Sequence, residues 1–346
     1  MKRGRIVIRA DADQTIGIGH VGRTMALASA WRREGGEVRY VAAAPLAAQA
    51  ETWIRSAGIA LDVIEAPRYS EADAEITARI AAGAPVVLDA FGTPLGYRSA
   101  LRGHCRRLAI IDDTGGTGPW SADIIINQNY GAEPGFYPGR DPAATLLLGP
   151  RHALLRPEFA RWRDRVQRRD GATLRIATSF GGADPKDTTS VALAALASLP
   201  TSGRRALLVA GAANPLAAML KARAGASGWP MRVLRRPSSM ARVFAWADLA
   251  VLAGGASIWE ALCLGVPAIG IAIADNQVPA AEALGRDGLW HYLGRAEELT
   301  ATKIADALAR LLADPDERRR LSEAGRAAVD GRGADLVAEA LARLEA

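Results

Sequence analysis

Short, near-continuous apolar runs alternate with segments of helical periodicity along this chain. Helical patterns at about residues 21–34, 45–57 and 71–82 separate the first four runs in the N-terminal half, which continues with two more: RIVIRA, EVRYVAAA, LDVIEA, PVVLDA, RLAIIDD and ADIIINQN. Strands without a polar face are buried on both sides, and the helices between them are typical crossovers of a parallel sheet. The pattern therefore predicts an α/β fold.

The alternation stops near residue 150 and then restarts. The stretch RPEFARWRDRVQRRDG is charged and amphipathic and ends at Gly171, which is typical of a connector. LRIATSF, RALLVAGA, MRVLRR, ADLAVLAGG and PAIGIAIA then alternate with helical segments. A chain of 346 residues exceeds the size at which one core usually stops growing. We therefore expect a Rossmann-like domain over 1–155, a connector over 156–171, a second Rossmann-like domain over 172–330, and a C-terminal helical segment, 331–346, that is a candidate to pack on the first domain.

Composition and charge exclude several classes of protein. At 49% hydrophobic and 23% charged residues the chain has ordinary globular composition, and no apolar run approaches the roughly 20 residues that cross a bilayer. The two cysteines, Cys105 and Cys263, lie far apart, which favours a reducing cytoplasm over a disulfide framework. The formal charge of +6 comes from scattered arginines with only 5% aromatic residues, so we do not expect a nucleic-acid partner. An acidic ligand such as a nucleotide diphosphate remains compatible.

Three strand-to-helix turns carry paired glycines and are the candidate ligand-binding turns. They are GIGH with Gly17 and Gly19, SFGGADP with Gly181 and Gly182, and AGGAS with Gly254, Gly255 and Ser257. Glycine lets backbone N–H groups approach a phosphate at a helix N-terminus, so two such turns in the second half could cradle a diphosphate. The alternative is that each glycine only permits a tight turn. The first turn falls short of G-x-G-x-x-G because Gly22 comes one residue early, so a dinucleotide site is not indicated.

His20 and Glu260 each have two interpretations. A neutral imidazole can transfer protons near pH 7, but a histidine in a turn can equally be a cap or surface residue. Glu260 either forms a capping box with Ser257 or accepts hydrogen bonds from a ribose. Asp112 and Asp113 are interpreted as turn and cap residues, and no HExxH, CxxC or clustered carboxylate set predicts a metal site.

Several segments together resemble a known family. RADADQTIGIGHVGRTMALA, IIDD followed by NQN, LGPRHALLRPEF, TSFGGADPKDTT and AGGASIWEALCLGVPAI with ADNQ look like the UDP-2,4-diacetamido-2,4,6-trideoxy-β-L-altropyranose hydrolase family of pseudaminic acid biosynthesis, which makes nonulosonic acids. The segment SSMARVFAWADLAVLAGGASIWEALCLGVPAI is also similar to the UDP-binding segment of the lipid II-forming N-acetylglucosaminyltransferase.

The resemblance implies a glycosyltransferase-B fold of two Rossmann-like domains with the nucleotide sugar in the cleft between them. It implies that His20 is the general base that activates water for attack on the anomeric carbon, releasing UDP, with no metal or cofactor. The residues that match family positions for the substrate are Gly17 and Gly19 in the first half, and Gly181, Gly182, Met240, Gly254, Gly255, Ser257, Glu260, Asn276 and Gln277 in the second.

One departure from the family pattern concerns the fourth strand. The family often has Asp-His-Tyr-Gly there, whereas this chain has Asp89-Ala90-Phe91-Gly92, so a tyrosine hydroxyl that could help to hold the water is replaced by Phe91. Tyr97 and Tyr130 are candidates to substitute. The sequence therefore predicts a metal-independent UDP-sugar hydrolase first, a glycosyltransferase that uses a UDP-amino sugar and an acceptor hydroxyl second, and a non-catalytic nucleotide-sugar binder third.

Overall fold

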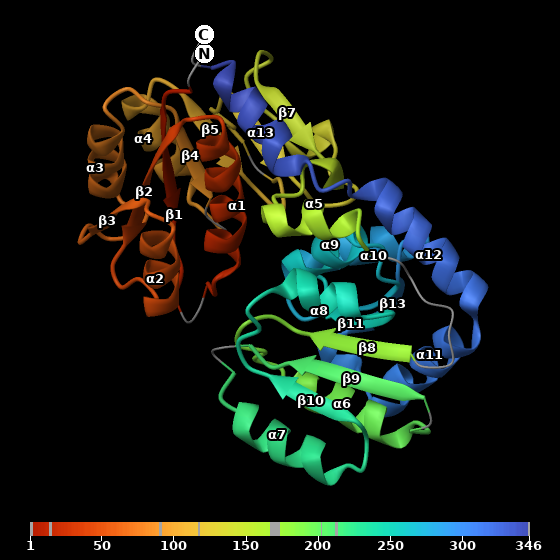
Figure 1. The fold of residues 1–346 in the computed structure, drawn as a ribbon. Coiled ribbons are helices and arrows are strands. Elements are labelled where there is room, and N and C mark those ends of the chain that lie inside the picture. The colour runs from red at the N-terminus through yellow and green to blue at the C-terminus, as the bar shows by residue number, and fades with distance from the viewer. Residues whose placement is uncertain are drawn as a thin grey trace. The chain divides into compact units, whose positions relative to one another are not determined.

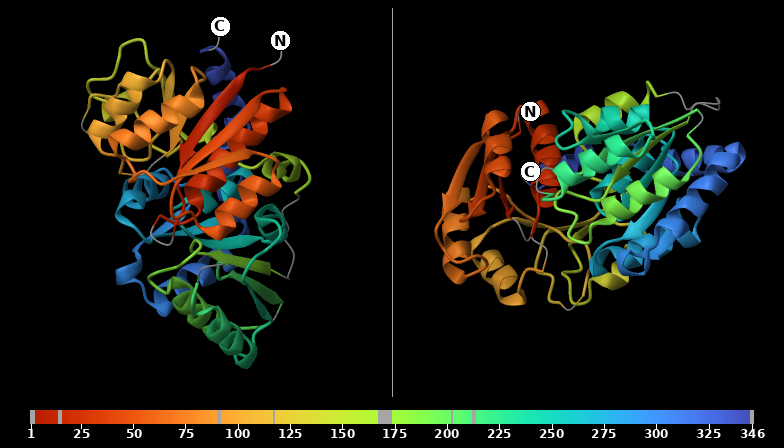
Figure 2. Two further views of the ribbon diagram at one scale, coloured as in Figure 1. Left: turned by 90° about the vertical axis from the view of Figure 1, so that its left-hand side faces the viewer. Right: turned by 90° about the horizontal axis from the view of Figure 1, so that it is seen from below.

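The computed structural model describes residues 3–13, 16–89, 92–116, 118–166, 174–201, 203–211 and 214–344. Phe91 and the end of the expected connector, 167–171, lie outside the described residues. The chain divides into two compact units, one of Met1–Pro157 with Arg332–Ala346 and one of Glu158–Gly331. Each unit contains a parallel sheet with helices on both faces (Figure 1, Figure 2).

Unit 1 has a seven-stranded parallel sheet in the order β3-β2-β1-β4-β5-β6-β7. The order reverses between β1 and β4, which pair in parallel with Ala10 opposite Asp89. In open sheets of this type, ligands bind outside the carboxyl ends of the strands at such a reversal. The strands are β1 (Arg5–Ala10), β2 (Glu37–Ala43), β3 (Ala60–Ile64), β4 (Val86–Asp89), β5 (Leu108–Ile111), β6 (Ile124–Asn127) and β7 (Thr145–Leu148).

The helices of unit 1 form two layers around this sheet. Buried residues of α1, α2 and α13, among them Trp31, Ile54 and Val337, pack on one face. Buried residues of α3 and α4, such as Ala74 and Leu101, pack on the other. The helices are α1 (Gly19–Arg33), α2 (Ala48–Ser56), α3 (Glu71–Ala81), α4 (Leu95–His104) and α13 (Gly333–Ala342), with short 3₁₀ turns η1 (Pro134–Phe136) and η2 (Pro150–His152).

Unit 2 repeats the plan with a six-stranded parallel sheet in the order β10-β9-β8-β11-β12-β13. The reversal lies between β8 and β11, where Ser179 is opposite Leu252. Helices α6, α7 and α11 pack on one face around a core that includes Leu196, Leu220 and Leu308. The strands are β8 (Leu174–Ser179), β9 (Arg204–Val209), β10 (Met231–Leu234), β11 (Leu249–Ala253), β12 (Ala268–Ala272) and β13 (His291–Arg295).

The remaining elements of unit 2 are helices and 3₁₀ turns. They are α5 (Pro157–Arg163), α6 (Thr188–Ser198), α7 (Ala217–Ala226), α8 (Met240–Trp246), α9 (Ala256–Cys263), η3 (Asp275–Gln277), α10 (Val278–Arg286), η4 (Ala296–Glu298), α11 (Ala301–Ala313) and α12 (Pro315–Ala328).

Part of the connector predicted over 156–171 forms the short helix α5. Phe159 is fully buried, and the Arg163 guanidinium donates hydrogen bonds of 2.8 Å to the carbonyl oxygens of Cys263, Arg326 and Val329. The described part of the segment beyond Pro157 therefore belongs to unit 2, and Arg163 anchors it there.

The C-terminal helix α13 packs against α1 and η2 of unit 1. Its first residue, Gly333, lies so close to η2 that a Cβ atom there would be 2.3 Å from the carbonyl oxygen of Ala153. Asp335 pairs with Arg33 of α1. The chain therefore leaves unit 1 after Pro157, the first residue of α5, and returns to it after Gly331.

We predict that Gly333→Ala destabilises unit 1, because the new methyl group meets backbone that cannot move aside. Overpacking of this kind costs about 1–3 kcal/mol. Urea unfolding should show the loss, and Gly96→Ala in α4, where a Cβ has open space, is the matched control. Equal stability of the two variants would contradict the close approach of α13 to η2.

Candidate functional site

The GIGH turn connects β1 to α1 at the strand reversal of unit 1. Gly17 has a φ of +76°, which glycine adopts at low cost, and its N–H donates to the carbonyl oxygen of Asp13 at 2.9 Å. The Asp13 carboxylate accepts a hydrogen bond from the Ile16 N–H at 2.7 Å. Helix α1 then begins at Gly19 with no side-chain cap and no acid in its first turn, so its positive end is open.

A buried ion cluster holds this turn in place. Arg9, fully buried at the end of β1, pairs with Asp11 at 2.6 Å and with Asp73 at 2.7 Å. Arg68 then bridges Asp11 at 3.2 Å and Asp13 at 2.8 Å. The acidic residues of the RADAD segment therefore support the loop, and they are matched by Arg9 of the same segment and by Arg68.

His20 faces a buried carboxylate across the reversal. Its Nδ1 atom lies 2.9 Å from Oδ1 of Asp89, whose side chain is 0% exposed, while the His20 side chain is 13% exposed. Because a carboxylate only accepts hydrogen bonds, this contact requires the proton of a neutral imidazole to be on Nδ1. The lone pair is then on Nε2, the nitrogen that can accept a proton.

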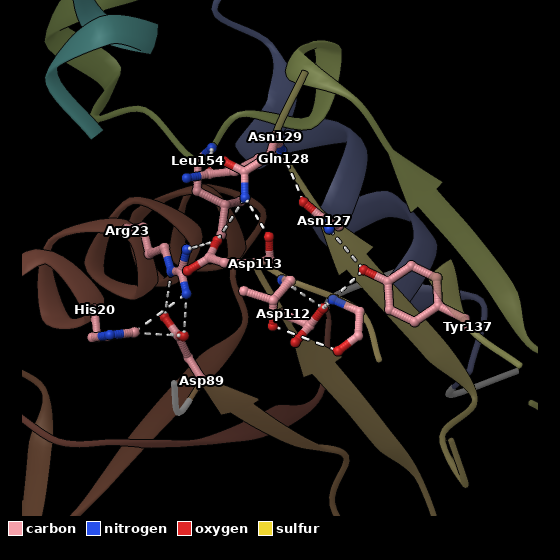
Figure 3. A network of polar contacts seen from close by, with 12 residues as sticks. His20, Arg23, Asp89, Asp112, Asp113, Asn127, Gln128, Asn129, Tyr137 and Leu154 are labelled. Carbon is pink, nitrogen blue, oxygen red and sulfur yellow. Dashed lines mark hydrogen bonds and ion pairs between the residues drawn. The ribbon is translucent and has the colours of Figure 1, made fainter. Parts of the chain in front are cut away.

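Arg23 keeps Asp89 ionised. Its Nε donates to Asp89 Oδ2 at 2.7 Å and its Nη2 to Asp89 Oδ1 at 2.6 Å, and the same guanidinium pairs with Asp113 at 2.7 Å through Nη1 (Figure 3). Burial raises the pKa of Asp89, but the charges and hydrogen bonds of Arg23 and His20 outweigh it and hold that pKa at about 2. Asp89 therefore acts as a fixed anion beside His20.

The interpretation of Asp112 and Asp113 as turn and cap residues is wrong for Asp113. Asp112 does accept hydrogen bonds from the N–H groups of Thr114 and Gly115, at 3.1 and 2.5 Å. Asp113 instead faces Arg23, and the Asn129 side chain donates to its carbonyl oxygen at 2.9 Å. The physical reason is the sheet order, which brings the ends of β4, β5 and β6 side by side.

Tyr137 completes the polar surroundings of Asp112. Its hydroxyl donates to Asp112 at 3.0 Å and accepts a hydrogen bond from Asn127 at 2.8 Å (Figure 3). Burial raises the pKa of Asp112, and the nearby Asp113 raises it further. Tyr97, expected as a substitute for the missing tyrosine, donates its hydroxyl to Asp73 at 2.9 Å and is 3% exposed. It is therefore part of the buried ion cluster.

In unit 2 the SFGGADP turn follows β8. Gly181 has a φ of +84°, and a Cβ on Gly211 after β9 would lie 2.3 Å from the carbonyl oxygen of Gly182. The Asp184 carboxylate accepts hydrogen bonds from the N–H groups of Thr188 and Thr189 at 3.0 and 2.8 Å. A carboxylate therefore already accepts hydrogen bonds from the first two N–H groups of α6.

The AGGAS turn follows β11. Unlike the SFGGADP turn, it is followed by a helix, α9, that has no side-chain cap at its N-terminus. Gly255 is the N-cap of α9, and neither a side-chain cap nor an acid stands in the first turn. The Ser257–Glu260 capping box, one of the two interpretations of Glu260, is therefore not formed, because the helix begins at Ala256, one residue before Ser257. An uncapped N-terminus of this kind is a ready anion site.

The ADNQ segment lies beside this helix end. A Cβ on Gly254 would lie 3.3 Å from Cβ of Gln277, and one on Gly255 would lie 3.5 Å from Gln277 Nε2. The Gln277 Oε1 atom accepts a hydrogen bond from the Ile273 N–H at 3.1 Å, which turns the amide nitrogen toward the glycines. Asn276 is the half-buried neighbour of Gln277 in η3.

Two other predicted substrate-binding residues of unit 2, Glu260 and Met240, lie in helices that precede Asn276 and Gln277 in the chain. Glu260 is half-buried in α9, one turn after Ser257. Met240 is the first residue of α8, whose N-cap Ser239 accepts a hydrogen bond from the Arg242 N–H at 3.1 Å and donates to Glu158 at 2.7 Å. Sequence reasoning did not identify Arg23, Asp89 as a partner of His20, or Asp184. An acidic residue at or after a strand end was the only signal for Asp89 and Asp184.

Two hollows in unit 2 do not include the glycine turns. One of about 510 Å³ is lined by Trp290 and Tyr292, and one of about 870 Å³ by Trp229 and Trp246, beside α8. Among the described ranges, Glu71, Glu75 and His104 are the only group close enough to share a cation, and all three are exposed. No helix in the described part of the chain has the length and apolar character needed to span a membrane.

Comparison with known proteins gives relatives in sequence and in fold. No family model matches the chain. It is 25% identical over 253 residues, 72% of the chain and 73% of the relative, to the spore coat polysaccharide biosynthesis protein SpsG of Bacillus subtilis. Over 106 residues, 29% of each chain, it is 42% identical to the UDP-N-acetylglucosamine–N-acetylmuramyl-(pentapeptide) pyrophosphoryl-undecaprenol N-acetylglucosamine transferase of Acidithiobacillus ferrooxidans.

The crystal structure of Acinetobacter baumannii MurG superposes with a TM-score of 0.71 at 15% identity, covering 99% of both chains. The chain has the glycosyltransferase-B fold. The expectation of two Rossmann-like α/β domains is thereby confirmed.

We predict that Asp89 makes folding stability depend on pH in acid. Its folded pKa of about 2 lies below the ordinary value near 4, so its contribution is present above pH 4 and is lost as the pH falls toward 2. Between pH 5 and pH 2 the wild type should lose about 2 kcal/mol more unfolding free energy than Asp89→Asn.

The control for this measurement is Asp62→Asn, which removes a half-exposed partner of Arg39 in the same sheet. It should follow the wild-type acid dependence within about 0.5 kcal/mol. Parallel curves for the wild type and Asp89→Asn in chemical unfolding would show that Asp89 carries no buried charge.

Proposed function

We propose that the chain transfers a sugar from a UDP-linked amino sugar to an acceptor hydroxyl, with His20 as the general base. The observation that carries the proposal is the contact between His20 Nδ1 and the buried Asp89, which leaves Nε2 as the proton acceptor. The partial sequence match to a transferase that is named for UDP-N-acetylglucosamine supports the donor class.

The proposed reaction is a single displacement at the anomeric carbon. Nε2 of His20 takes the proton of the acceptor hydroxyl, and the oxygen forms the new bond to the anomeric carbon. The bond from that carbon to the diphosphate oxygen breaks, and UDP leaves with the electron pair. A positioned base contributes about 10²- to 10⁴-fold to such a rate.

The charge balance around His20 favours this role. With a neutral imidazole, one arginine, Arg23, faces two carboxylates, Asp89 and Asp113, so the group carries one net negative charge. When His20 takes up the proton of the acceptor, the net charge of this group becomes zero. Asp89 therefore orients the imidazole and stabilises the imidazolium that forms.

We assign the diphosphate to the N-terminus of α9. The backbone of Gly254, Gly255 and Ser257 presents an open, uncapped helix end there, and the Gln277 amide nitrogen lies beside it. Helix α6 is less suitable, because Asp184 already accepts the hydrogen bonds of its first turn. Met240, Glu260 and Asn276 remain proposed substrate contacts, as do Gly181 and Gly182 through their backbone.

The hydrolase is the second candidate, and it differs only in the acceptor. Its support is the collinear resemblance of the GIGH, SFGGADP and ADNQ segments to the hydrolase family. The relatives with printed activities favour transfer instead. Water and an alcohol need the same base, so the geometry of His20 suits both, and the sugar specificity remains a proposal.

Phosphorus NMR distinguishes the two reactions. UDP-linked amino sugars are incubated with the protein alone and with a panel of sugar and polyol acceptors, and free UDP is measured. We expect UDP release that depends on an acceptor and that falls by at least about 10²-fold in His20→Asn. Equal release without acceptor would establish the hydrolase, and no release under any condition would leave only a binding protein.

We predict that Ser257→Asp weakens UDP binding about tenfold or more, because its carboxylate would stand in the first turn of α9 beside the diphosphate. An acid at this position favours the helix itself, so the variant should fold. Calorimetric titration with UDP checks the affinity, and Ser257→Asn is the uncharged control with a similar side chain. If both variants bind UDP like the wild type, the diphosphate does not bind at this helix end.

A further inference from the structure

The IIDD segment enters the reaction proposed above only through the charge of Asp113, and the NQN segment has no part in it. They follow β5 and β6, which lie next to β4 in the sheet, and β4 lies next to β1. Four neighbouring strands thus present polar residues at one edge: His20 after β1, Asp89 at the end of β4, Asp113 after β5 and Asn129 after β6. Arg23, one turn after His20 in α1, contacts the carboxylates of both aspartates.

The hydrogen bonds run without a gap along this edge (Figure 3). Asn129 is fixed by its N–H, which donates to the Asn127 side chain at 2.9 Å, and it donates to the Asp113 backbone at 2.9 Å and to the Asp113 carboxylate at 3.3 Å. Asp113 accepts a hydrogen bond from Nη1 of Arg23, and Nε and Nη2 of Arg23 donate to the two oxygens of Asp89. Asp89 in turn faces His20 Nδ1.

The fork between Arg23 and Asp89 determines the direction of the carboxylate. Two parallel hydrogen bonds, of 2.7 and 2.6 Å, fix the carboxylate plane, which a single contact would leave free to rotate. Nη2 of Arg23 also lies 3.3 Å from His20 Nδ1. Since Arg23 only donates, a proton on Nδ1 is favourable only while Asp89 lies between the two groups and accepts from both.

We propose that Arg23 and Asp113 are positioning residues that select the Nδ1–H form of His20, with Asn129 holding Asp113 in place. None of the three contacts the substrate in this proposal. They act through Asp89: Asp113 gives the arginine a second anchor, and the Asn129 amide holds Asp113. The inference rests on the proposed role of His20 as base, but its main readout does not need turnover.

The test compares Asp113→Asn and Arg23→Lys with the wild type by ¹⁵N NMR of histidine-labelled protein at a pH where His20 is neutral. We expect one Nδ1–H signal pattern for His20 in the wild type and a mixture with the Nε2–H form in both variants. Arg23→Lys keeps the charge but loses the fork, so it separates geometry from charge. Asp62→Asn and Arg39→Lys are the matched controls, because they alter an arginine–aspartate pair elsewhere in the same sheet.

Kinetics add a second readout once UDP release is measurable. Asp113→Asn should lower kcat about 10- to 100-fold, as loss of residues that orient a catalytic group typically does, while KM for the UDP-sugar changes less than about threefold. An unchanged His20 signal in both variants, with lower thermal stability, would overturn the proposal, because Arg23 and Asp113 would then only stabilise the fold. A lost Nδ1–H signal with no turnover even in the wild type would support the positioning and contradict only the proposed function.

Discussion

The buried carboxylate of Asp89 is the constraint on which unit 1 depends. It lies at the end of β4, beside the strand reversal, and it is shielded completely from solvent. A buried anion of this kind is costly unless it is paired and hydrogen-bonded. Arg23 supplies the opposite charge and two hydrogen bonds, and Nδ1 of His20 supplies the other contact to the carboxylate. The need to satisfy one carboxylate therefore fixes the first two turns of α1 and the orientation of the imidazole.

The same principle explains why the two glycine turns of unit 2 differ. Each helix N-terminus has N–H groups that need partners. In α6 the chain provides its own anion, Asp184, which is 5% exposed and also accepts from the Thr189 hydroxyl at 2.6 Å. In α9 no side chain does so. A ligand anion would therefore complement the N-terminus of α9, whereas at α6 it would compete with Asp184.

Much of the fold could be predicted from the sequence, because buried parallel strands are continuous apolar runs. RIVIRA, PVVLDA and ADLAVLAGG each contain a strand of the structure, β1, β4 and β11. The edge strands β7 and β13 were missed, because the apolar run of β7 is only three leucines long and HYLGR in β13 contains no continuous apolar run. Helix α5 was taken for a connector because its charges hide one buried aromatic residue, Phe159.

The candidate site was only partly predictable for a different reason. Glycine turns and His20 are local features that a linear pattern displays. The partners of His20 are not local: Asp89 is 69 residues away, and Arg23 joins Asp113 across 90 residues. Only the order of strands in the sheet brings them together. That order also explains why Asp113, which in sequence resembles a turn residue, is an ion-pair partner.

The protonation of the His20–Asp89 pair tests the account most directly. Neutron diffraction from a deuterated crystal at neutral pH locates the deuteron. The account predicts a deuteron on Nδ1 of His20, directed at Oδ1 of Asp89, with neither oxygen of Asp89 carrying one and Nε2 bare. A deuteron on Asp89, or on Nε2 with Nδ1 bare, would contradict it, because His20 would then have no oriented lone pair with which to accept a proton.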